Sequence, residues 1–161
     1  MATGSVQVYH GEGRGKSSAA LGKGIRAASE GKDVFVIQFL KGKTDAEMEF
    51  IKRLEPEIKF FRFEKSEENF NELSEEEQRE EVQNIRNGLN FAKKVLSTGE
   101  CDMLILDEVL GILENNLVEE EDLQNIINAR SEDTDLIMTG TVLSEAFKPQ
   151  IDEIYRIISE K

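Results

Sequence analysis

A glycine-rich segment near the start of the chain has the residue types of a phosphate-binding loop. It consists of Gly11, Glu12, Gly13, Arg14, Gly15, Lys16, Ser17 and Ser18. Glycines allow the backbone to turn N–H groups inward around an anion. The N-terminus of a following helix carries partial positive charge and adds to the attraction for that anion. Lys16 offers a full charge to phosphate, and Ser17 offers a hydroxyl to Mg²⁺. The segment is therefore predicted to bind the phosphates of a nucleotide.

The spacing of this segment differs from the usual P-loop consensus. That consensus has a glycine six positions before the lysine, where this sequence has His10. An unusual glycine turn with a lysine by chance is the alternative interpretation. The flanking pattern favours the loop, because a strand-like run over residues 6–9 precedes it and a helix-like, alanine-rich run over residues 17–29 follows.

Two carboxylates at the end of an apolar run are the second candidate for chemistry. Asp107 and Glu108 directly follow the apolar residues 103–106, which is the form of a Walker B segment, where an acid holds the metal or its water. Paired acids also begin ordinary helices. Their occurrence together with the glycine loop favours a Mg²⁺ site formed by Ser17, Asp107 and Glu108.

The charge distribution indicates where an anion could bind. The formal net charge is −13, which excludes modes of binding that need a broad basic surface, such as duplex DNA or an anionic membrane. The first 43 residues nevertheless hold seven basic and three acidic residues, against thirteen and thirty in the remainder. Lys41 lies in this basic part and could reach phosphates, although an isolated lysine is often only a solvated charge.

The sequence has one cysteine, Cys101, and one histidine, His10. A single cysteine excludes an internal disulfide, and one cysteine with one histidine is too few for a Cys/His zinc site. The lack of a second histidine also argues against the usual histidine-based catalytic triads. The longest apolar runs, residues 34–37 and 103–106, are too short for a bilayer span or a signal-peptide core. We expect a protein of the reducing cytoplasm with no membrane and no nucleic acid as partner.

Apolar runs and helix-start signals alternate along the chain. The expected strands cover residues 6–9, 34–39, 58–63, 103–106 and 136–138, with 154–158 as a candidate sixth. The expected helices cover residues 17–29, 44–55, 74–96 and 119–129, with an acidic loop over 64–73. Two of these helices begin with a capping box, at Thr44 and at Ser74. The pattern predicts one α/β domain over residues 1–161 with a mostly parallel sheet of five to six strands, and ligands beyond the carboxyl ends of the strands.

Four blocks, in this order, resemble the ATP:corrinoid adenosyltransferases. The blocks are residues 11–22 (GEGRGKSSAALG), 36–42 (VIQFLKG), 104–108 (LILDE) and 139–140 (TG). The resemblance implies a RecA-like P-loop NTPase fold of three layers, in which the strand at 136–138 lies between the P-loop strand and the Asp107 strand. It also implies a homodimer that transfers the 5′-deoxyadenosyl group of ATP to the Co(I) of a corrinoid, in adenosylcobalamin synthesis or salvage, and releases triphosphate.

The same resemblance assigns roles to particular residues. ATP would bind to the loop residues 11–18 and to Lys41, Mg²⁺ would be a cofactor, and Lys16 and Glu108 would be catalytic. The corrinoid, of cobalamin or cobinamide type, would be reduced to Co(I) by a partner reductase. In this family an aromatic wedge from the loop after the third strand displaces the lower ligand of cobalt, and the matching candidates here are Phe70 and, just before the loop, Phe63. Phe39, at the end of the second strand, is a further candidate for contact with the corrinoid.

Three departures from the family pattern keep other functions open. Thr141 stands where the family usually has arginine, the chain has no tryptophan, and the family's terminal Lys-His-Pro-Phe segment is not found. One alternative is a catalytically impaired paralogue that binds ATP or a corrinoid as a carrier or interaction module. A generic ATPase or kinase is the other alternative.

Overall fold

A computed structural model describes residues 3–40 and 50–161 of the chain. Six strands in these residues form one sheet in the order β3-β2-β4-β5-β1-β6, and every neighbouring pair is parallel. The strands are β1 (Val6–His10), β2 (Val34–Gln38), β3 (Ile58–Arg62), β4 (Met103–Asp107), β5 (Asp135–Thr139) and β6 (Glu153–Arg156). The predicted α/β class is confirmed, and so is the candidate sixth strand.

The strand β5 lies between β1 and β4, as the resemblance implied. Leu136 of β5 is in register with Val6 of β1 on one side and with Leu104 of β4 on the other. The carboxyl ends of β1, β4 and β5 therefore meet at one edge of the sheet. At that edge lie the glycine loop, Asp107 and Thr139.

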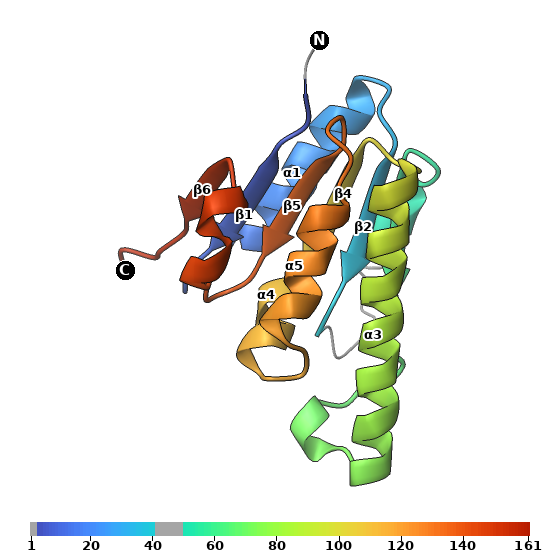
Figure 1. Cartoon of the computed structure of the whole chain (residues 1–161), viewed down its shortest axis with the longest axis vertical. Helices are drawn as coiled ribbons and strands as arrows, with labels where there is room; N and C mark the ends of the chain where they lie inside the picture. The colour runs from blue at the N-terminus through green and yellow to red at the C-terminus, as the bar shows by residue number, and fades with distance from the viewer. Residues whose placement is uncertain (1–2, 41–49) are drawn as a thin grey trace.

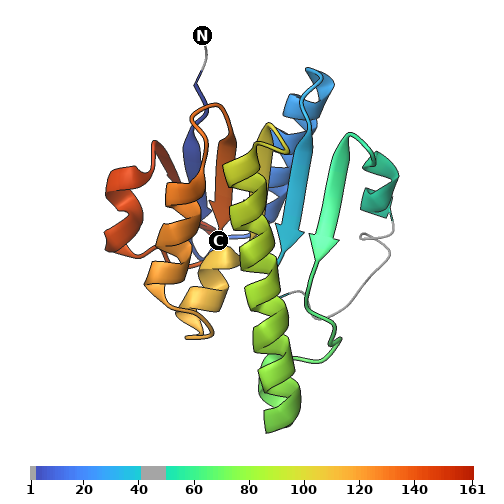
Figure 2. The ribbon, with the colours of Figure 1, turned by 45° about the vertical axis from the view of Figure 1, so that its right-hand side comes forward.

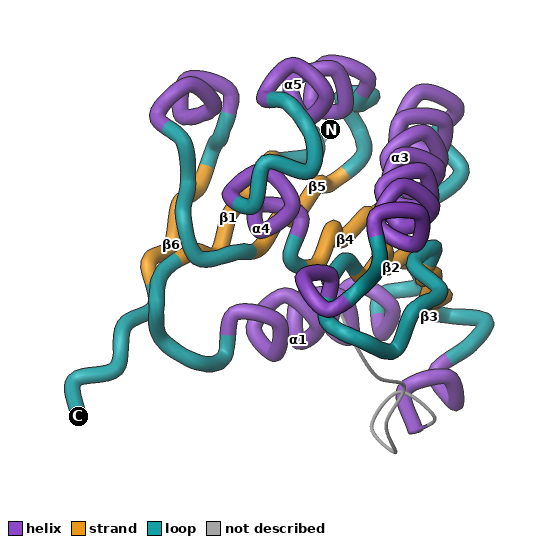
Figure 3. The backbone as a smooth tube through the Cα atoms, turned by 90° about the horizontal axis from the view of Figure 1, so that it is seen from below, coloured by secondary structure: helices purple, strands orange, loops and turns teal. Residues whose placement is uncertain are grey.

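Helices cover both faces of the sheet, so that the fold has three layers, with the sheet between two layers of helices (Figure 1). They are α1 (Lys16–Ser29), α3 (Glu75–Thr98), α4 (Val109–Glu114) and α5 (Glu120–Ala129). Figure 3 shows α1 on one face and α3, α4 and α5 on the other. Strands such as β1 and β4 are buried along nearly their whole length, because helices cover both of their faces. None of the helices in the described part of the chain is long and apolar enough to cross a membrane.

The long helix α3 begins at the predicted capping box. The Glu77 N–H donates to the Ser74 hydroxyl, and the Glu77 carboxylate accepts from the Ser74 N–H, both at 3.2 Å. The helix ends at Gly99, which has a left-handed φ of 68° that suits glycine. Figure 2 shows its first turns extending beyond the carboxyl edge of the sheet, where the loop after β3 folds against them.

Several elements differ from the expectation, among them a 3₁₀ helix over Glu145–Gln150 that was not predicted. The short helix α4 was not predicted, because six residues directly after Glu108 are too few to show helical periodicity. The acidic loop contains a single 3₁₀ turn, Phe70–Glu72. The capping box predicted at Thr44 lies outside the described residues.

Candidate functional site

The glycine loop connects β1 to α1 and is held by backbone hydrogen bonds that its N–H groups donate to two other segments. The Gly11 N–H donates to the Thr141 carbonyl at 3.0 Å, and the Gly13 N–H donates to the Ile157 carbonyl at 2.9 Å. Gly11 has a φ of 116°, and a Cβ there would lie 2.4 Å from the Ile157 carbonyl oxygen. Only glycine fits such a close approach in this backbone conformation. The bond to Thr141 uses its main chain and is independent of the residue type at that position.

The N-terminus of α1 lies directly behind the loop and has the features of an anion site. Gly15 at its N-cap forms no side-chain cap, and the first turn contains no acidic residue. The first N–H groups of any α-helix lack an acceptor within the helix. Lys16 bends back over the loop, where its Nζ donates to the carbonyls of Gly11 at 2.8 Å and Gly13 at 2.9 Å. Positive charge and N–H donors thus converge at one place.

Asp107 joins the loop to the sheet. It is the last residue of β4 and is 4% exposed. Its Oδ1 accepts hydrogen bonds from the Ser17 hydroxyl at 2.6 Å and from the Thr139 hydroxyl at 2.8 Å. The structure therefore brings the predicted residues Ser17 and Asp107 into direct contact. Thr139 was missed as a site residue, although its position at the end of a strand next to β4 was a usable signal.

Glu108 points to the other side of the sheet. It has a left-handed φ of 63°, uncommon for a residue with a side chain, and its N–H donates to the Thr139 hydroxyl at 2.9 Å. Its Oε2 would lie 3.2 Å from a Cβ on Gly111, which places the carboxylate over the first turn of α4. The two adjacent acids thus face different layers, which supports different roles for them.

The donor set suits Mg²⁺ that arrives with phosphates. In the described part of the chain, no three side chains of His, Cys, Asp or Glu converge as a metal site. Magnesium in nucleotide sites is commonly held by one or two carboxylates together with phosphate oxygens and water. The contact between Ser17 and Asp107 beside the N-terminus of α1 provides that partial set. The residues fit a metal bound together with nucleotide, and they do not form a complete cage of their own.

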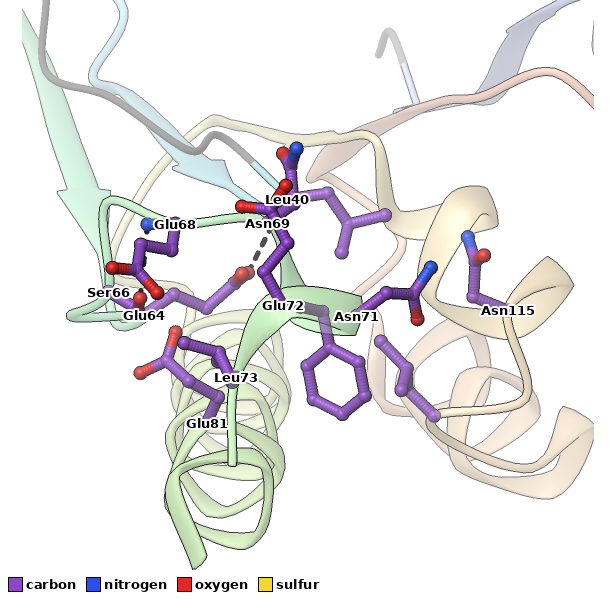
Figure 4. Close-up of a pocket in the computed structure, with 12 residues that line it drawn as sticks. Leu40, Glu64, Ser66, Glu68, Asn69, Asn71, Glu72, Leu73, Glu81 and Asn115 are labelled. Carbon is purple, nitrogen blue, oxygen red and sulfur yellow. Dashed lines mark hydrogen bonds between the residues drawn. The ribbon is translucent and has the colours of Figure 1, made fainter. Parts of the chain in front are cut away.

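A cleft of about 500 Å³ opens at the same edge of the sheet, beyond β2 and β3 (Figure 4). In Figure 4 Glu64 and Glu68 lie on one side of it and Asn115 on the other. The lining residues are Leu40, Glu64, Ser66, Glu68, Asn69, Phe70, Asn71, Glu72, Leu73, Glu81, Asn115 and Leu117. The wall is thus rich in carboxylate and amide groups, with a few apolar side chains between them.

The three candidate corrinoid phenylalanines have different surroundings. Phe39 is 1% exposed in the main core. Phe63 packs on Phe91 with ring centroids 5.5 Å apart. Phe70 alone among the three lines the cleft. The structure therefore gives Phe39 and Phe63 packing contacts and leaves Phe70 as the candidate for contact with a ligand.

The match to a family model decides which family this chain represents. Residues 2–161 match the model described as ATP:corrinoid adenosyltransferase BtuR/CobO/CobP. The chain belongs to the ATP:corrinoid adenosyltransferase family. The predicted family and enzyme class are thus confirmed.

Individual relatives of this adenosyltransferase agree with the family match. A corrinoid adenosyltransferase of Escherichia coli K12 is 29% identical over 138 residues, which cover 85% of this chain and 67% of that protein. The corrinoid adenosyltransferase of Pseudomonas aeruginosa is 28% identical over 138 residues, covering 85% and 66%. The chain thus matches about two thirds of the length of these relatives.

A solved structure supports the fold alone. EssC (ATPases 2 and 3) from Geobacillus thermodenitrificans has a TM-score of 0.51 and 13% identity, and the match covers 98% of this chain and 33% of that one. Structural neighbours of this kind are ATPases with a P-loop fold, as the sequence predicted.

The remaining predicted ATP contacts of the adenosyltransferase lie around the loop. Glu12, Arg14 and Ser18 are exposed at its rim, while Lys16 and Ser17 are half-buried beneath them. Lys41 lies outside the described residues. The predicted phosphate and metal residues from β1, α1 and β4 are therefore close together, and the assignment of each to ATP remains a prediction.

Glu64 in the cleft wall provides a test of pH dependence. Burial raises its pKa, and nearby Glu81 adds to the effect, although Glu64 accepts a hydrogen bond from the Leu40 N–H at 2.9 Å. A raised carboxyl pKa means that stability is greatest below the unfolded pKa and falls as pH rises through the folded pKa. We expect Glu64→Gln, which retains the acceptor, to raise the melting temperature near neutral pH and to leave it unchanged below about pH 4. Melting curves across pH test this, and an equal shift at every pH would contradict it.

Proposed function

We propose that this chain transfers the 5′-deoxyadenosyl group of ATP to the Co(I) of a corrinoid and releases triphosphate. The observation that carries the proposal is the cluster of Lys16, Ser17 and Asp107 at the N-terminus of α1, on the same edge of the sheet as the large cleft. A phosphate site and a site for a bulky second substrate on one edge suit a reaction between two bound molecules.

In this reaction the cobalt supplies the nucleophile. An electron pair of Co(I) forms the Co–C5′ bond, the C5′–O bond breaks, and triphosphate leaves with the electrons of that bond. The cobalt becomes formally Co(III) in the alkyl product. The chain therefore needs no nucleophile of its own, and its tasks are to hold C5′ and cobalt in line and to stabilise the leaving triphosphate.

Each part of the phosphate site has a task in this proposal. The N–H groups at the start of α1 and the ammonium of Lys16 bind the triphosphate oxygens, so that negative charge developing on the leaving group meets fixed donors. Ser17 and Asp107 would hold Mg²⁺ at the phosphates, and the ion would neutralise part of the negative charge of the phosphates. Glu108 lies on the α4 side of β4, and its proposed role is to orient the substrates between the phosphate site and the cleft.

The cleft beyond β2 and β3 is the proposed corrinoid site, with Phe70 as the apolar wedge below the ring. Its carboxylate and amide walls suit the amide-bearing edge of a corrinoid. If Phe70 keeps the lower base away from cobalt, Phe70→Ala should slow transfer to cobalamin by roughly tenfold or more, because the reacting atoms lose their alignment. Transfer to cobinamide, which lacks the lower base, serves as the control and should change little.

Steady-state rates with both corrinoids and the affinity for ATP provide the measurement for Phe70. A selective loss with cobalamin, at unchanged ATP affinity, supports the wedge. Equal losses with both corrinoids would show that Phe70 only anchors its loop to α3.

The proposed setting follows from the family. The chain is proposed to act in the cytoplasm as a homodimer, with a reductase supplying Co(I). A carrier that binds ATP or corrinoid without transfer is the second candidate, because Thr141 offers no cation where the family usually has arginine. Phosphorus NMR of a reaction with ATP and reduced corrinoid separates the two. Transfer yields one triphosphate for each alkylated corrinoid, and a carrier yields none.

A further inference from the structure

A buried glutamine beside Asp107 has a side-chain carbonyl without a partner. Gln38, the last residue of β2, is 8% exposed. Its Oε1 accepts no hydrogen bond from any of the described residues. A buried carbonyl without a donor costs free energy, and folded proteins keep few of them. Such an atom at a binding site points to a donor that arrives with the ligand.

The surroundings of Gln38 belong to the proposed metal site. Strands β2 and β4 are paired in parallel, and Gln38 is in register with Asp107. Together with Ser17 and Ser18 they border a small cavity of about 60 Å³ between α1 and the sheet. The rest of the lining is apolar and consists of Leu21, Val36, Ile51, Phe60 and Ile105. The polar part of the cavity lining is therefore formed by the two serines, Asp107 and Gln38.

The polar residues of this cavity indicate which group could donate a hydrogen bond to the Gln38 Oε1. Asp107 already accepts two hydroxyl hydrogen bonds at its Oδ1, and no lysine or arginine among the described residues lines the cavity. Mg²⁺ held by few protein atoms keeps several waters, and each bound water donates hydrogen bonds. An amide carbonyl accepts such a bond without placing a second negative charge next to Asp107.

We propose that Gln38 is a positioning residue whose Oε1 accepts a hydrogen bond from a water on the Mg²⁺ held by Ser17 and Asp107. This inference rests on the proposed metal site. Gln38 then orients the water shell and strengthens metal binding, without touching the phosphates or the corrinoid. Partners of this kind behind metal ligands typically change metal affinity by roughly 10–100-fold.

The test measures Mn²⁺ binding to the protein–ATP complex by electron paramagnetic resonance, without corrinoid, together with the melting temperature of the ligand-free protein. Gln38→Met retains the size but removes the acceptor. Mn²⁺ affinity should fall about tenfold, while the melting temperature stays equal or rises because an unpaired buried carbonyl is lost. Gln38→Glu retains an acceptor and should bind Mn²⁺ at least as tightly as wild type. Gln38→Asn, with its carbonyl withdrawn by one methylene, should bind more weakly.

Gln7 provides a matched control. It is also 8% exposed, and its Oε1 also has no partner in the part of the chain that the structure describes. It lies within β1, however, where its Nε2 donates to the Ser5 hydroxyl at 2.9 Å. Gln7→Met should leave Mn²⁺ affinity unchanged. Equal losses in Gln7→Met and Gln38→Met would reflect a general loosening of the sheet and would overturn the inference.

A comparison with Asp107→Asn separates this inference from the proposed function. Weaker Mn²⁺ binding in Asp107→Asn but not in Gln38→Met overturns the role of Gln38 and leaves the metal site standing. Unchanged binding in both variants overturns the metal site and the inference together. A fall in melting temperature for Gln38→Met with unchanged Mn²⁺ affinity identifies Gln38 as a structural residue only.

Discussion

Replacing Lys16 with alanine is expected to lower kcat/KM for adenosyl transfer by about 100-fold or more. The ammonium is the mobile full charge at the loop, and losing one such donor to a charged leaving group typically costs roughly 2.7–4 kcal/mol of transition-state stabilisation. Within residues 3–40 and 50–161 of the ligand-free protein, Lys16 donates only to the carbonyls of Gly11 and Gly13. The fold should therefore persist, with little change in melting temperature.

The measurement for Lys16 compares initial rates of transfer and ATP affinity in the variant and the wild type. Lys23→Ala is a matched control, because Lys23 is an exposed lysine further along the same helix. It removes one positive charge from α1 without touching the loop. If Lys16→Ala retained a rate within twofold of wild type, the phosphates would have to bind elsewhere.

A second large effect is expected for Asp107→Asn. The amide oxygen can still accept hydrogen bonds from Ser17 and Thr139, so the packing at the end of β4 is retained. The negative charge that attracts the metal is lost. We expect the Mg²⁺ concentration for half-maximal transfer to rise by roughly tenfold or more, with a smaller change in melting temperature.

Magnesium titrations of transfer activity measure this effect. Asp102→Asn is the control, because Asp102 lies just before the opposite end of β4, where its carboxylate accepts from the Asp33 N–H at 2.8 Å. Matching Mg²⁺ titration curves for wild type and Asp107→Asn would contradict the Walker B assignment of Asp107.

Local sequence patterns predicted the elements that position the site. Five apolar runs identified β1 to β5, and the capping box at Ser74 marked the start of α3 correctly. The glycine loop was placed correctly because a strand-like run precedes it and a helix-like run follows it in the sequence. These features depend on residues near one another in the chain, which a sequence shows directly.

The parts that the sequence did not reveal depend on contacts between distant residues. The bond from Thr139 to Asp107 spans 32 positions, and the pairing of Gln38 with Asp107 follows from sheet register. Neither produces a spacing signal. The phenylalanines show the same limit, because the packing of Phe39 against Gly88 of α3 joins residues far apart in the sequence.

Transfer of an adenosyl group to cobalt can be followed in the visible spectrum of one reaction. The protein is mixed without oxygen with ATP, Mg²⁺ and chemically reduced cobalamin. We expect alkylcobalamin bands to grow and to disappear on exposure to light, and we expect no growth when ATP is left out. Release of phosphate without any change in the corrinoid spectrum would contradict the account and identify an ATPase instead.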